Sequence, residues 1–220
     1  MKRRLLWLVV FAVAMGYLEA AVVVYLRRLF YPEGFAFPLK QISIRVGAIE
    51  IAREAATLAM LIGISFATEA TRRARLACLM LIFGIWDITY YLWLWVTVGW
   101  PESLLTWDVL FLIPVIWTGP VLAPVLVSIA MIGASLLYYL RGEEAERVHI
   151  SKPEWILVVA SAVTIFISFA LNHSLVFEGG IPQRFHWEIF LPGLGVGLVV
   201  LARIARRITW VFGSSQVLRE

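Results

Sequence analysis

Residues 5–27, LLWLVVFAVAMGYLEAAVVVYLR, form a nearly unbroken apolar run in which Glu19 is the single acid. At about 1.5 Å per residue a helix of this length covers about 35 Å, and the hydrocarbon core of a bilayer is roughly 30 Å thick. Residues 1–4, MKRR, give the stretch the outline of a secretory signal. The apolar run resumes after residues 16–21 and reaches span length, so we expect an uncleaved first membrane span.

The composition extends this pattern to the whole chain. Of its 220 residues 61% are hydrophobic and 15% are charged, whereas soluble proteins carry about 25% charged residues. Cys78 is the only cysteine, which excludes disulfide frameworks, cysteine-based zinc sites and iron–sulfur clusters within one chain. The pI of about 9.5 comes from basic residues at the ends of apolar runs. Because that is a topology signal, we set nucleic-acid binding aside.

Apolar runs separated by charged or Pro/Gly-rich breaks predict an all-α, polytopic transmembrane helix bundle. The bundle is expected to be a single integral membrane domain, residues 1–220, whose main partner is the lipid bilayer. The six predicted spans lie near residues 5–27, 44–69, 76–98, 108–140, 155–176 and 188–209.

Lys and Arg at the predicted helix ends set the orientation, because cytoplasmic loops carry an excess of both. One side holds thirteen of them: Lys2, Arg3, Arg4, Arg72, Arg73, Arg75, Arg141, Arg147, Lys152, Arg203, Arg206, Arg207 and Arg219. The other side holds five: Arg27, Arg28, Lys40, Arg45 and Arg184. We therefore expect both termini in the cytoplasm and the chain in an inner or plasma membrane.

The fourth predicted segment, residues 108–140, is too long for a simple span, since a straight helix would measure about 50 Å. Its first half is interrupted by Pro114, Gly119, Pro120 and Pro124. Each proline removes a helical hydrogen bond and disfavours helix at the residue before it. We expect a short outer or re-entrant piece near 104–116 followed by a span near 118–140. The alternative is one long kinked helix that protrudes outward.

Charged side chains cost about 2.5–3.5 kcal/mol each at the centre of a span, and this chain places its embedded acids at one depth. With the orientation above, these acids fall in the outer half of the membrane, and His173 lies at the outer end of the fifth span. We expect a polar pocket that opens to the outer face. Its predicted lining residues are Glu19, Glu50, Arg53, Glu54, Asp87, Tyr91, Asp108 and His173.

Two functional hypotheses follow from such a pocket. In the first, Glu50, Glu54, Asp87 and His173 bind a divalent metal that activates water, although the Glu-x-x-His element of di-metal bundles is missing. In the second, the acids carry protons or hold a cation in a small-solute transporter, and this hypothesis includes a homo-oligomer in which two protomers form one transporter. A transporter needs a polar route through the inner half, which carries almost no embedded charge, so an enzyme or a ligand-binding protein is favoured.

A third hypothesis gives the cluster a purely structural role in an accessory subunit of a membrane complex. Arg53 and Arg45 would then neutralise the glutamates, while Tyr90 and Tyr91 would satisfy Asp87. Haem bound by His173 and His186 is the least favoured cofactor, because single histidines at helix ends are more often interfacial hydrogen-bond donors. The sequence contains no complete catalytic or cofactor motif, and it does not choose between these functions.

Overall fold

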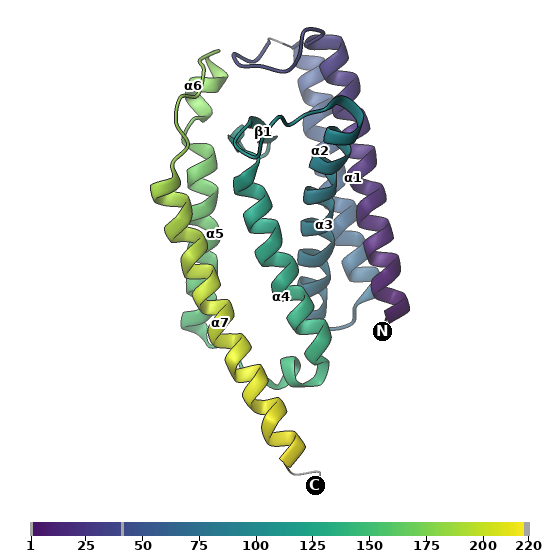
Figure 1. The fold of residues 1–220 in the computed structure, drawn as a ribbon, viewed down its shortest axis with the longest axis vertical. Coiled ribbons are helices and arrows are strands. Elements are labelled where there is room, and N and C mark those ends of the chain that lie inside the picture. Colours follow the sequence, from purple (N-terminus) through teal and green to yellow (C-terminus); the bar gives the residue numbers. More distant parts are fainter. Residues whose placement is uncertain (1, 41, 218–220) are drawn as a thin grey trace.

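The computed structural model describes residues 2–40 and 42–217, which form a helical bundle with one small β-hairpin (Figure 1). Its elements are α1 (Lys2–Phe30), α2 (Ile44–Thr68), α3 (Arg72–Val98), β1 (Trp107–Phe111), β2 (Trp117–Pro120), α4 (Leu122–Arg147), α5 (Lys152–Ala170), α6 (His173–Phe177) and α7 (Trp187–Val217). Six helices of the described chain are long and apolar enough to cross a membrane. The predicted all-α bundle of six spans is therefore confirmed.

All six long helices run between the same two ends of the bundle (Figure 1). We call the end that carries β1 and β2 the hairpin end, and the opposite end, where the chain begins and finishes, the terminal end. Capping residues fix several helix starts: Ser43 accepts a hydrogen bond from the backbone of α2, and Thr71 does the same for α3. Ser151 and Glu154 form a capping box at the start of α5.

Small residues let the helices approach closely in two separate groups. Gly16 on α1 lies against α3, where an added Cβ would meet the Trp86 carbonyl oxygen at 3.0 Å. Gly84 on α3 lies against α4 in the same way. On the other side of the molecule Gly197 on α7 packs on Ser161 of α5. Helices α1 to α4 thus form one group and α5 with α7 forms the other, as small-residue contacts in membranes allow (Figure 1).

The two groups meet mainly at their ends. At the hairpin end Phe169, Phe185 and Phe190 pack with Ala123 and with aromatic residues of the hairpin. At the terminal end a smaller cluster of Ala145, Val148 and Ile208 joins α4 to α7. Between these clusters the facing sides of the two groups are not in close contact, which leaves the space described below.

The fourth segment differs from the prediction in its boundaries. Residues 107–120 form an antiparallel hairpin in which Asp108 pairs with Gly119 and Val109 pairs with Thr118, and α4 begins only at Leu122. The span predicted near 108–140 is therefore shorter, and the long kinked helix is wrong. The prolines block a helix here, while aromatic and β-branched residues between them favour strands.

Candidate functional site: an ion-paired network and an apolar crevice

Arg53 on α2 is the centre of the first polar group at the hairpin end. Its Nε donates to Glu50 Oε2 at 2.8 Å, and its guanidinium also pairs with Glu19 on α1. Thr57 donates to the other oxygen of Glu19 at 3.2 Å. The helices α1 and α2 have little direct backbone contact, so this group is a main link between them. All its members are largely shielded from solvent.

Arg27 and Asp108 form a second pair, between the end of α1 and β1. An Arg27 NH group lies 3.2 Å from Asp108 Oδ1, and the guanidinium carbon lies 3.6 Å from the centre of a Trp100 ring. Tyr91 lies near the same carboxyl group, whose Oδ2 is buried without a hydrogen-bond partner among the described residues. Burial raises the pKa of Asp108 to about 6, although Arg27 opposes that rise. We call the residues centred on Arg53 and Arg27 the ion-paired network; its members are Glu19, Arg27, Glu50, Arg53, Thr57, Tyr91 and Asp108.

Two further predicted site residues bind the turn between the strands. Glu54 Oε2 accepts the Leu112 backbone N–H at 2.9 Å, and His173 Nδ1 accepts the Ile116 backbone N–H at 3.2 Å. Glu54 and His173 thus position the hairpin over the bundle.

Asp87 on α3 has a different environment from the other embedded acids. Its Oδ2 accepts a hydrogen bond from Ser128 on α4 at 2.8 Å, and within residues 2–40 and 42–217 it forms no ion pair. The predicted satisfaction of Asp87 by Tyr90 and Tyr91 is therefore wrong, since within the described chain the hydrogen bond to Asp87 comes from Ser128. Arg45, the other predicted counter-charge, is exposed on α2.

The four predicted metal ligands are thus distributed over separate partners. Glu50 pairs with Arg53, Glu54 and His173 bind the turn, and Asp87 binds Ser128. Across the described residues no group of three or more His, Cys, Asp or Glu side chains is arranged to hold a metal ion. His186, the second predicted haem ligand, has its own partner, because its Nδ1 lies 3.1 Å from Glu188 Oε1.

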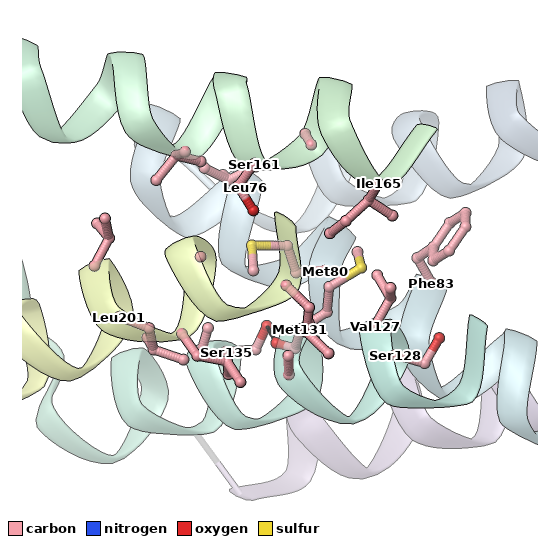
Figure 2. A pocket seen from close by; sticks show the side chains of 18 of the residues that line it. Leu76, Met80, Phe83, Val127, Ser128, Met131, Ser135, Ser161, Ile165 and Leu201 are labelled. Carbon is pink, nitrogen blue, oxygen red and sulfur yellow. Dashed lines mark hydrogen bonds between the residues drawn. The ribbon is translucent and has the colours of Figure 1, made fainter. Parts of the chain in front are cut away.

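An apolar cavity of about 560 Å³ lies between α3 and α4 on one side and α5 and α7 on the other. We call it the crevice. Met80 and Met131 extend into it from α3 and α4, and Ser161, Ile165 and Leu201 face it from the other group (Figure 2). Phe111 and Trp117 of the hairpin line its upper end, while Arg73 and Ile208 line it near the terminal end.

Asp87 is the one predicted site residue that lines the crevice, and its partner Ser128 lines it as well. Both lie toward the hairpin end. The remaining lining is mostly aliphatic and aromatic, with Arg73, Ser135, Tyr138 and Ser161 as the other polar residues. Such a cavity, apolar with a few placed polar groups, is the usual form of a small-molecule site.

Sequence reasoning missed Arg27 and Ser128 as members of these sites. Arg27 lies at the end of an apolar run, an ordinary position for an interfacial arginine. Its predicted depth is the same as that of Asp108 and its charge is opposite, so the sequence did contain a signal for their pairing. Ser128 is a small polar residue in an apolar helix, and only the packing of α3 on α4 shows its role. No family model, curated protein or solved structure matches this chain, so the geometry alone carries the functional argument.

Proposed function

We propose that this integral membrane protein binds an elongated apolar molecule, such as the hydrocarbon chain of an amphiphile, in the crevice. One observation carries the proposal: a cavity of about 560 Å³ is lined almost entirely by apolar side chains from both helix groups. Ligand cavities commonly measure about 300–1,000 Å³ and owe their affinity to apolar lining.

The length of the crevice suits a chain better than a compact ring system. On α3 alone the lining runs from Arg73 to Asp87, a rise of about 21 Å at roughly 1.5 Å per residue. Met80 and Met131 lie in its middle (Figure 2), and flexible thioethers adapt to ligands of variable shape. These features support a long, conformationally adaptable ligand.

Photolabelling tests the proposal directly. The protein in phosphatidylcholine nanodiscs is irradiated with a diazirine-bearing octadecanol, and the labelled peptides are identified by mass spectrometry. Saturable labelling is expected on crevice residues of α3, α4 and α5, and unlabelled octadecanol should compete with it. Labelling that does not saturate, or that is equal on the exposed face of α1, would mean that bulk bilayer contact alone produced it.

A pair of neighbouring variants on α4 supplies the control. Ala134→Trp places a large side chain into the crevice, because Ala134 is part of its lining. Gly133→Trp adds the same ring one position away, where an added Cβ meets nothing within 4 Å. Binding in the crevice predicts that Ala134→Trp loses most of the saturable labelling while Gly133→Trp keeps it. Equal labelling of the two variants contradicts the proposal.

The alternative functions receive less support from the arrangement of side chains. A metal-assisted enzyme would need Glu50, Glu54, Asp87 and His173 to converge, and each has a separate partner in the described chain. A transporter of protons or cations would need a polar route to the terminal end, where the crevice is mostly apolar. An accessory-subunit role is compatible with the ion-paired network, and it would leave the crevice without a purpose.

The membrane placement is part of the same proposal. The excess of Lys and Arg at the terminal end supports a cytoplasmic location of both termini in an inner or plasma membrane. The crevice then has its carboxylate in the outer half of the bilayer. Cysteine accessibility at Ser103 near the hairpin and at Lys152 near the start of α5, measured in intact cells with an impermeant reagent, tests this orientation.

A further inference from the structure

We propose that the ligand of the crevice carries a cationic group, such as an ammonium, that pairs with Asp87. This inference rests on the proposed binding of an amphiphile and names the chemistry of its polar end. It follows from Asp87, the one predicted site residue that lines the crevice.

The other acids at the hairpin end are already compensated inside the protein. Glu19 and Glu50 share Arg53, and Asp108 has Arg27. Glu54 forms no ion pair among the described residues, but it accepts a backbone N–H, follows Arg53 directly on α2 and does not line the crevice. Each of these acids therefore has a cation or a backbone donor inside the protein, although Asp108 Oδ2 is buried without a hydrogen-bond partner among the described residues.

Asp87 has one donor, the Ser128 hydroxyl, and is 9% exposed. In the part of the chain that the structure describes, no Lys or Arg pairs with it. An isolated charge in a membrane interior is expensive and marks a functional site whose partner has to be identified.

The walls around Asp87 suit an organic cation rather than a metal ion. Phe83 lies one helical turn before Asp87 and lines the crevice with Phe111 and Trp117. Trp86 connects these rings, with centroids 5.3 Å from Phe83 and 6.1 Å from Phe111. Aromatic faces attract ammonium groups, and a single carboxylate provides the opposite charge. A metal ion would need several oxygen or nitrogen ligands, which this end of the crevice lacks among the described residues.

The position of Asp87 near the hairpin end of the crevice also determines where the hydrocarbon chain of the ligand lies. An ammonium at Asp87 leaves the chain to run toward the terminal end past Met80, Met131 and Leu201 (Figure 2). Apolar lining on both helix groups then shields the ion pair from water. An ion pair in such surroundings is stronger than one at a surface.

Competition by head group tests the inference. In phosphatidylcholine nanodiscs the diazirine octadecanol is displaced by hexadecyltrimethylammonium, hexadecanol or hexadecyl sulfate, which share one chain length. The cation should displace the probe at a concentration about tenfold lower than the sulfate, as expected for about 1.4 kcal/mol of added affinity. In Asp87→Asn the probe should still label the crevice, and the preference for the cation should disappear.

Two matched variants separate this effect from general changes of charge. Glu54→Gln removes another buried acid that does not line the crevice, and it should keep the preference for the cation. Asp87→Glu retains the charge and should keep it as well. If Asp87→Asn does not fold, the wild-type protein and Glu54→Gln still decide the question by comparing the three head groups.

The possible failures are distinguishable. Equal displacement by all three compounds, or a preference that survives in Asp87→Asn, overturns the cationic ligand while the crevice remains a chain-binding site. Absence of saturable labelling by the uncharged probe overturns the proposed function itself.

Discussion

The ion-paired network and the crevice both reach the hairpin end, and their buried acids have different partners. In the network each acid faces a guanidinium, as Glu19 faces Arg53 and Asp108 faces Arg27. In the crevice Asp87 faces a hydroxyl and an apolar space. A compensated acid holds helices in register, whereas an uncompensated acid beside a cavity is available to a ligand. The number of acids in a membrane segment therefore says less about function than their partners do.

The largest effect is expected from breaking the network at its centre. Arg53→Met leaves Glu19 and Glu50 buried without their cation, and it removes one of the links between α1 and α2. Removing one partner of a buried ion pair costs about 3–5 kcal/mol. Unfolding of the purified protein in mixed micelles with increasing dodecyl sulfate measures this loss.

A compensating variant shows whether charge is the cause. The triple variant Glu19→Gln, Glu50→Gln, Arg53→Met has no uncompensated charge and should recover most of the lost stability. A triple variant as unstable as Arg53→Met alone would indicate that Arg53 stabilises through packing. In that case the pairing of charges would not explain the stability of the network, and the contrast with the unpaired charge of Asp87 would not hold.

The same contrast explains how much the sequence could predict. Apolar length and charged breaks were enough for the six spans, because both are local properties of the chain. The common depth of the acids followed from their positions along those spans. Their partners depend on how each helix is rotated and on where the hairpin sits. The pairing of Arg53 with glutamates was one of the hypotheses, and the structure shows it for Glu19 and Glu50. The Leu112 contact to Glu54 was beyond the reach of periodicity.

The crevice itself has no sequence signature. Met80 and Met131 look like ordinary core positions, and they line a cavity only because the facing sides of the two helix groups stay apart. The sequence predicted a short outer or re-entrant piece near 104–116 before a separate span, but not that residues 107–120 form a β-hairpin. A strand pairing between residues eleven positions apart, such as Asp108 with Gly119, needs tertiary contacts that single positions do not show.

The next effect concerns the α3–α4 contact, which forms one wall of the crevice. An added Cβ at Gly84 would lie 2.8 Å from the backbone oxygen of Ser128 and 2.8 Å from Ile132 Cγ1. Gly84→Ala should therefore force the helices apart and destabilise the protein by about 1–3 kcal/mol, as overpacked cores do. The dodecyl sulfate titration described above gives the value.

Gly133→Ala is the matched control on the same pair of helices. Its Cβ meets nothing within 4 Å, so the change should be neutral or stabilise by up to about 1 kcal/mol through helix propensity. If both variants behave alike, α3 and α4 are not held at the separation that places Ser128 against Asp87.

Asp87→Asn is expected to have a smaller effect on stability than any change in the network. The amide retains an oxygen that accepts from Ser128, and no buried guanidinium in the described chain loses a partner. The free energy of unfolding should change by less than about 1 kcal/mol, or increase because a buried charge is gone. A loss as large as that of Arg53→Met would place Asp87 among the structural acids and remove its distinction from the network.

The smallest effect is expected at Glu146, an acid at the terminal end that is also held by hydroxyl groups. Tyr138 and Thr71 donate to the same oxygen of its carboxylate, and these two hydrogen bonds, Tyr138 first, lower the pKa of Glu146 below its ordinary value of 4.5. A lowered pKa stabilises the fold above the ordinary value, and that contribution is lost as the pH falls through the folded-state pKa. Glu146 is exposed, so Glu146→Gln should cost less than about 1 kcal/mol near pH 7.

The pH dependence of this small loss is the informative quantity. Thermal melts near pH 7 and near pH 3 should show a larger difference between wild type and Glu146→Gln at the higher pH, and Tyr138→Phe should reduce that difference. A larger loss than that of Asp87→Asn would contradict the expectation. Hydroxyl groups contribute little free energy to the exposed Glu146, because water already solvates its carboxylate. The same kind of partner leaves the buried carboxylate of Asp87 incompletely compensated, because the crevice beside it is apolar. What distinguishes Asp87 is therefore its surroundings rather than its hydrogen bond.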